Sequence, residues 1–233
     1  MGRADSLAVA AGLDRPTTAY LARFPGNGQV VDLEVSWAEL ARDALWCAEL
    51  LNGFGLERGH RVLLSFYGYE GPWFSPVIEA LRSIGAGYAT ADAMGWDHHR
   101  VTVFHQELRP HAVIGLSLET LEGLSGQVEL RRMFTDTPMV LARPDAVRRL
   151  RGAGVAAGTI TPLGPALALE CHLRQGAHVN AAEWRIAERE GELVLSAAPG
   201  RAAGLGEVLL GIGGAVVGER CDCGSDDPRV LFR

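Results

Sequence analysis

Two kinds of hydrophobic pattern alternate between residues 36 and 116. Apolar positions recur at helical spacing over residues 37–53, 72–85 and 98–110, and short apolar runs occupy residues 61–68, 87–93 and 111–116. The first helix has clear boundary signals, because Ser36 and Glu39 have capping-box spacing and Gly53 and Gly55 follow the last apolar turn. Strands that alternate with helices of this length predict a parallel sheet with right-handed crossovers.

The pattern changes in the second half of the chain. A further helix, strand and helix are predicted over residues 129–134, 138–142 and 144–154. After residue 158, short strand-like runs cover residues 166–173, 183–190, 192–198, 207–212 and 228–232, and two of them flank Glu190-Gly191 as in a hairpin. The predicted fold class is α/β, with an N-terminal segment (1–30), a parallel-sheet α/β subdomain (31–160) and a small mostly-β subdomain (161–233).

Charge and composition exclude several classes of protein. The formal net charge of -6 argues against general binding to nucleic acid or to an anionic membrane. No apolar run reaches the roughly 20 residues that span a bilayer, and the first residues lack the sustained apolar core of a signal peptide. We therefore expect a cytoplasmic protein whose thiols stay reduced.

All 22 basic residues are arginine, so the sequence contains no lysine. Composition bias in the gene is the simple explanation. The chemical consequence is that the chain offers no Schiff-base lysine, no phosphate-loop lysine and no lysine to neutralise a transferred phosphate.

Three short motifs lie within the first α/β units. Residues 37–40 (WAEL) form an aromatic-x-E-L helix start, residues 55–62 match a G-x-x-x-G-D-R-V turn with His60 in place of the aspartate, and residues 80–86 (ALRSIGA) end the next helix. In this order they resemble the N-terminal region of adenylate-forming enzymes, the acyl-CoA synthetases and their relatives. The resemblance covers about residues 30–120 and implies the fold of that family.

Two later segments are similar to one branch of that family. Residues 176–201 (GAHVNAAEWRIAEREGELVLSAAPGR) and 221–229 (CDCGSDDPR) resemble stretches of the phenylacetate–CoA ligases. The resemblance implies a protein related to enzymes that activate a carboxylate with ATP and pass it to coenzyme A.

Several motifs that this family uses for ATP are absent from the sequence. Residues 115–134 pass through the expected position of a Ser/Thr/Gly-rich phosphate loop without forming one, and only Glu170 remains of the adenylate motif. No aspartate stands in the ribose-binding position before Cys221. We also expect the family's C-terminal domain, which carries its catalytic lysine, to be missing. Because adenylation needs magnesium and donors around a triphosphate, we expect no ATP cofactor and no autonomous ATP-dependent ligation.

Four residues of the β-rich part form a candidate metal site. Cys171, His178, Cys221 and Cys223 make a Cys₃His set, which is a composition of closed structural zinc sites. His172 is a competing ligand, but it adjoins Cys171, and adjacent residues of a strand point to opposite faces. The alternative is that these are reduced thiols with packing roles, since C-x-C is tighter than the usual zinc spacing.

Aromatic residues cluster at the turn after the first strand of the α/β part. Tyr67, Tyr69, Trp73 and Phe74 can line a ligand pocket there, because open α/β sheets bind ligands at the carboxyl ends of their strands. The alternative is that they pack the helix onto the sheet or form a dimer contact. No arrangement of residues identifies a catalytic nucleophile or an acid–base pair.

These observations lead to three functional hypotheses. The first is a degenerate acyl-CoA synthetase-like protein that binds a small carboxylate or acyl-type molecule, or assists a biosynthetic enzyme, without adenylation of its own. The second is an enzyme that uses the remaining pocket for different chemistry without ATP. The third is a subunit that a partner chain completes. A reduced fold exposes surfaces that were once covered, so we also expect a homodimer or a partner protein.

Overall fold

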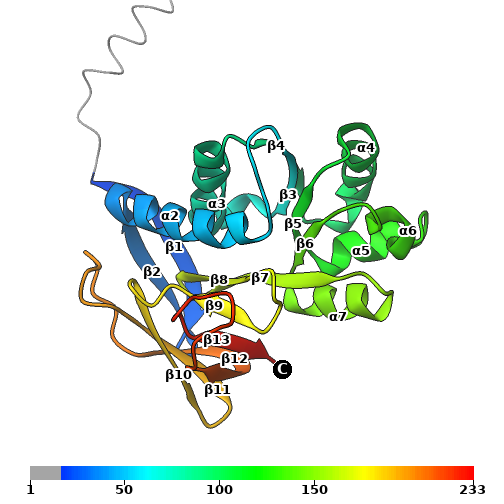
Figure 1. Ribbon diagram of the computed structural model, residues 1–233. Helices are drawn as coiled ribbons and strands as arrows, with labels where there is room; N and C mark the ends of the chain where they lie inside the picture. The colour runs from blue at the N-terminus through cyan, green and yellow to red at the C-terminus, as the bar shows by residue number, and fades with distance from the viewer. Residues whose placement is uncertain (1–16) are drawn as a thin grey trace, which may run out of the picture.

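The computed structural model describes residues 17–233 (Figure 1). Eleven strands form one sheet in the order β10-β11-β12-β13-β9-β8-β7-β6-β5-β3-β4, and β1 and β2 form a separate two-stranded sheet. The strands are β1 (Thr18–Gly26), β2 (Gln29–Ser36), β3 (Arg61–Phe66), β4 (Gly87–Asp92), β5 (Ala112–Leu116), β6 (Met139–Ala142), β7 (Ala157–Leu163), β8 (Ala166–Glu170), β9 (Ala177–Val179), β10 (Trp184–Arg189), β11 (Glu192–Ala197), β12 (Val208–Val217) and β13 (Arg229–Phe232). The helices are α2 (Trp37–Gly53), α3 (Gly71–Ile84), α4 (His98–Leu108), α5 (Leu118–Ser125), α6 (Leu130–Phe134) and α7 (Pro144–Gly152), with 3₁₀ turns η1 (Gly68–Glu70) and η2 (Gly95–Asp97).

Strands β3 to β7 pair in parallel, as the alternation of helices and strands predicts. Helices α2 and α3 cover one face of this part of the sheet, and α4 to α7 cover the other (Figure 1). Val62 and Leu64 of β3 pack in the core beneath α2 and α3, whereas Leu63 between them packs in the core on the opposite face. Burial on both faces explains why these strands are continuous apolar runs.

Strand β7 joins the parallel and antiparallel parts of the sheet. It pairs in parallel with β6 and antiparallel with β8, and the strands beyond β8 all pair antiparallel. Residue 160, where the sequence divides into two patterns, lies inside β7. The predicted hairpin around Glu190-Gly191 is confirmed as β10–β11. The predicted fold class, a parallel α/β part followed by a mostly-β part, is therefore confirmed.

Strands β1 and β2 form a hairpin that the sequence analysis does not predict. Its turn is Asn27-Gly28, and both residues have positive φ (52° and 69°), which is typical of a type I′ turn. The amide of Asn27 donates a hydrogen bond of 2.8 Å to the carbonyl of Leu209, so the hairpin is fixed to β12. Of the expected N-terminal segment, residues 1–16 lie outside the described residues.

The predicted boundaries of α2 and α3 agree with the structure. The Ser36 hydroxyl accepts from the Glu39 amide at 3.3 Å, and the Glu39 carboxylate accepts from the Ser36 amide at 2.7 Å, so the capping box is confirmed. Gly85 ends α3 with a left-handed φ of 83°. Within residues 17–233, no helix combines the length and the apolar character that a bilayer crossing needs.

Candidate functional site

The four predicted metal ligands come from three segments of the β-rich part. Cys171 directly follows β8, His178 is the middle residue of β9, and Cys221 and Cys223 lie in the loop between β12 and β13. In Figure 1 this loop, coloured red, lies beside β9. Strand β9 pairs with both β8 and β13, and this pairing brings the three segments together. The structure therefore unites all four residues that the sequence proposes.

The ligand atoms of this Cys/His cluster lie within 4.8 Å of one another. The Sγ atoms of Cys171 and Cys221 are 3.9 Å apart, and Cys223 Sγ is 3.6 Å from His178 Nε2. A disulfide needs about 2.05 Å between sulfurs, and all four cysteines of the chain are free thiols in this structure. Because Cys223 alone among the four is only partly buried, the cluster lies just beneath the surface, and it can hold a metal ion.

The cluster's surroundings give its donors different protonation behaviour. Burial raises the pKa of Cys171 to about 12. Burial also opposes ionisation of Cys221, but hydrogen bonds from the Cys223 amide and the neighbouring thiols outweigh it and lower the pKa of Cys221. Burial lowers the pKa of His178, which keeps its imidazole neutral and able to donate a lone pair.

Asp227 fixes the cysteine loop against the rest of the fold. Its carboxylate accepts hydrogen bonds from the Trp46 indole at 2.8 Å, from the Ala181 amide at 2.9 Å and from the Ser225 hydroxyl at 3.0 Å. These contacts tie the loop to α2 and to the segment after β9. The competing ligand His172 is exposed and contacts Phe54 edge-on, outside the cluster.

The four aromatic residues of the predicted pocket occupy different environments. Tyr67 lines a cavity. Tyr69 is 73% exposed, and its ring stacks on the ring of Tyr67 with 5.3 Å between the centroids. Trp73 and Phe74 are buried in the core: the Trp73 indole donates to the Gly164 carbonyl at 3.0 Å, and Phe74 stacks on Phe66. Of the four, Tyr67 is the residue that contributes to the cavity wall.

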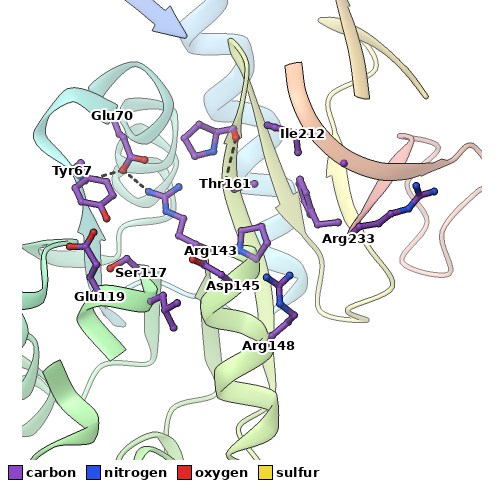
Figure 2. Close-up of a pocket in the computed structure, with 15 residues that line it drawn as sticks. Tyr67, Glu70, Ser117, Glu119, Arg143, Asp145, Arg148, Thr161, Ile212 and Arg233 are labelled. Atoms are coloured by element: carbon purple, nitrogen blue, oxygen red, sulfur yellow. Dashed lines mark hydrogen bonds and ion pairs between the residues drawn. The ribbon is translucent and has the colours of Figure 1, made fainter. Parts of the chain in front are cut away.

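This cavity has a volume of about 520 Å³ and lies at the carboxyl ends of the parallel strands (Figure 2). One wall comes from residues that directly follow β3, β5 and β6, namely Tyr67, Ser117 and Arg143. The opposite wall comes from β12 and β13, including Ile212 and Phe232. The α/β part and the β-rich part thus form the cavity together, in the place where open sheets bind ligands.

A buried ion pair lies in the wall of the cavity. Arg143 Nη2 donates to Glu70 Oε2 at 2.5 Å, and the same oxygen accepts from the Tyr67 amide at 2.9 Å. The guanidinium also lies over the ring of Phe74, with 5.1 Å from Cζ to the centroid. Burial raises the pKa of Glu70 and lowers that of Arg143, and the charge of each residue opposes the shift in the other.

The second terminal nitrogen of Arg143 has no hydrogen-bond partner among the described residues, although it is buried. Figure 2 shows the guanidinium between Glu70 and the strand that carries Thr161. Neither Arg143 nor Glu70 is identified as a site residue from the sequence. A signal for Arg143 exists, because it directly follows the apolar run of residues 138–142 and precedes Pro144 at a helix start.

No protein-family model matches this chain, and no curated protein matches it in sequence. Solved structures of 2-hydroxyisobutyryl-CoA ligase are similar to it. The open form in complex with 2-HIB-AMP and CoA gives a TM-score of 0.67 at 14% identity, covering 95% of this chain and 58% of the ligase. The postadenylation state in complex with R3-HIB-AMP gives a TM-score of 0.68 at 14% identity, covering 99% of this chain and 57% of the ligase. The chain thus has the fold of an adenylate-forming acyl-CoA ligase over less than two thirds of that enzyme's length.

Proposed function

We propose that this chain, which has an acyl-CoA ligase fold, binds a small carboxylate or acyl-type molecule in the cavity beside Arg143 and does not adenylate it unaided. The observation that carries this proposal is the buried Nη1 of Arg143, which lacks a partner among the described residues. A buried guanidinium with a free donor is an unfavourable arrangement unless an acceptor completes it. A carboxylate of the ligand would supply that acceptor.

The chemistry of the cavity supports this class of ligand. The Glu70 carboxylate already fixes one edge of the Arg143 guanidinium, so the remaining donor has a defined orientation. Tyr67, Ile212 and Phe232 offer ring and aliphatic surface for the rest of a small acid. The volume of about 520 Å³ lies within the range of ligand pockets and leaves ample room for a small acid.

The absence of adenylation is proposed from the sequence. The 233 residues contain no lysine, and no Ser/Thr/Gly-rich phosphate loop follows the first α/β unit. Charge on the phosphoryl oxygens must be neutralised as pyrophosphate leaves. A lysine and a phosphate-binding loop normally supply that neutralisation.

Calorimetric titration with 2-hydroxyisobutyrate and phenylacetate tests the binding, and ATP–pyrophosphate exchange with the same acids tests the chemistry. We expect one acid to bind, Arg143→Gln to lose binding by on the order of tenfold or more, and no exchange to occur. Arg109→Gln removes the same charge outside the cavity and should bind normally. Arg233→Gln keeps the test valid if Arg143→Gln misfolds, because Arg233 is an exposed part of the cavity wall. Binding unchanged in both cavity variants, or measurable exchange, would contradict the proposal.

We further propose that the Cys171/His178/Cys221/Cys223 cluster holds a structural zinc ion. Zinc–sulfur bonds of about 2.3 Å in a tetrahedron place two sulfurs about 3.8 Å apart, and Cys171 Sγ and Cys221 Sγ are 3.9 Å apart. Four protein donors would leave no position for a catalytic water. Native mass spectrometry of protein purified without chelator should show one zinc per chain, lost in Cys221→Ser and retained in Cys47→Ser. A metal-free mass for the unmodified protein would contradict this proposal.

A further inference from the structure

A second cleft, of about 470 Å³, lies between α5, α6 and α7 on the face of the sheet opposite α2 and α3. Three of its lining residues are arginines, Arg131 from α6 and Arg148 and Arg149 from α7. Glu129 is the one carboxylate among its lining residues. The cleft is therefore a concave surface with an excess of positive charge.

The three arginines have no carboxylate partner in the part of the chain that the structure describes. Within residues 17–233, no ion pair or side-chain hydrogen bond involves the guanidinium of Arg131, Arg148 or Arg149. By contrast, Arg143 and Arg151 of the same region pair with Glu70 and Glu170. The cleft thus keeps an excess of positive charge, which Glu129 offsets only in part.

The local charge is opposite to that of the whole chain. The protein has a formal net charge of -6, yet residues 131–151 contain six arginines and only two acidic residues, Asp136 and Asp145. An acidic protein that collects arginines in one segment creates a local potential that attracts anions.

The fold also positions these arginines. Val147 and Leu150 of α7 are buried in the core, so the intervening Arg148 and Arg149 are directed toward the surface. The Arg131 stem lies against Gly154, where an added Cβ would be 3.5 Å from Cδ. Gly154 has a left-handed φ of 80°, which favours glycine, and the missing Cβ leaves room for the Arg131 side chain.

We propose that this cleft binds the phosphate group of a small molecule. Guanidinium groups present planar pairs of N–H donors that match phosphate oxygens, and a phosphate dianion can engage more than one of them. This phosphate site is independent of the proposed carboxylate site. Arg148 lines both the cleft and the Arg143 cavity. The test therefore uses Arg131 and Arg149, neither of which lines the Arg143 cavity, although Arg131 also borders a hollow beside Gly154.

The test is to titrate the full chain with inorganic phosphate, pyrophosphate and phenyl phosphate and to measure the affinity for each by calorimetry or NMR. Arg131→Gln/Arg149→Gln should weaken binding by on the order of tenfold or more for each arginine that contacts the anion. Arg58→Gln/Arg109→Gln removes the same charge from positions outside the cleft and should bind as the unmodified protein does. Preference for phenyl phosphate over inorganic phosphate would identify a phosphate ester as the ligand, and the reverse preference would identify free phosphate.

Three results would overturn the inference. The first is that none of the three anions binds at millimolar concentration. The second is that Arg131→Gln/Arg149→Gln binds the anions as tightly as the unmodified protein, and the third is that the Arg58→Gln/Arg109→Gln control loses as much affinity as the cleft variant. The last result would show that overall charge, and not this cleft, attracts the anion. Phosphate binding that survives Arg143→Gln would keep this site separate from the proposed carboxylate site, whichever of the two proposals fails.

Discussion

The Nη2 atom of Arg143 lies 2.5 Å from the Oε2 atom of Glu70, and this contact joins the segment after β6 to the turn after β3. The Arg143 amide also donates to the Leu116 carbonyl at 2.9 Å, at the end of β5. One residue thus connects the carboxyl ends of three neighbouring strands. Both side chains of the pair are at least nine-tenths buried, so neither charge is well solvated.

Removing one partner of this ion pair should destabilise the fold strongly. Arg143→Met leaves the Glu70 carboxylate buried without a counter-charge, and we expect a loss of about 3–5 kcal/mol in the free energy of unfolding. Glu70→Gln/Arg143→Met removes both charges and should recover much of this loss. Urea denaturation of the two single variants and the double variant measures the coupling. Additive effects of the two substitutions would show that the pair contributes no coupling energy.

Removal of a bound metal ion should lower the free energy of unfolding, and this loss should require an intact Cys/His cluster. We expect a chelator to reduce the free energy of unfolding by on the order of 3 kcal/mol and the unfolding temperature by roughly 10 °C, because the ion binds the folded state. Cys223→Ser should show the lowered temperature without chelator and no further response to it. Cys47→Ser, which changes a buried thiol outside the cluster, should respond to chelator as the unmodified protein does.

Metal affinity should increase with pH. The pKa of Cys171 is raised to about 12, so in the metal-free protein its thiol holds a proton at neutral pH, and an ion must displace that proton to bind. The pKa of His178 is lowered, so its imidazole is already neutral and competes less with the metal. Stability that the metal contributes is therefore present at higher pH and is lost as the pH falls. Calorimetry in buffers of different ionisation enthalpy should detect proton release on zinc binding; zero release would contradict the prediction.

Gly115 allows β5 to approach β3 closely and should not tolerate a side chain. A Cβ there would lie 2.2 Å from the Ser65 carbonyl oxygen and 3.0 Å from the Phe74 ring, and the residue has a φ of 96°. We expect Gly115→Ala to lose about 3 kcal/mol or more, through backbone strain and overpacking. Gly68→Ala is the matched control, because a Cβ at Gly68 would have no neighbour within 4 Å. Thermal unfolding of both variants gives the comparison, and equal unfolding temperatures would refute it.

Local sequence signals predict most of the parallel part of the fold. The apolar runs of β3 to β6 and the capping box at Ser36 are short-range features, and each is found where the pattern places it. The β1–β2 hairpin was predictable too, because Asn27-Gly28 is followed by the alternation of Leu33 and Val35 with acidic residues. Helix α5 was not predicted, since its eight residues complete barely two turns and give little periodicity.

The two candidate sites differ in how well the sequence predicts them. The Cys/His cluster was predictable, because the chain has only four cysteines, and three of them fall with His178 in two short segments, residues 171–178 and 221–223. The cavity beside Arg143 was not predictable, because it forms only where β12 and β13 face the ends of β3, β5 and β6. That juxtaposition follows from the order of the strands in the sheet, which no local pattern encodes. The free donor of Arg143 is likewise a property of tertiary contacts.

Strand β7 is hydrogen-bonded to β6 on one side and to β8 on the other, so no flexible connection separates the two parts of this chain. The walls of the Arg143 cavity, which come from both parts, are therefore connected by the strand pairing of one continuous sheet. The cavity is open to solvent, so a ligand can enter it without a hinge motion between the two parts. The same continuity should make thermal unfolding one cooperative event, with far-ultraviolet and tryptophan fluorescence signals changing at the same temperature.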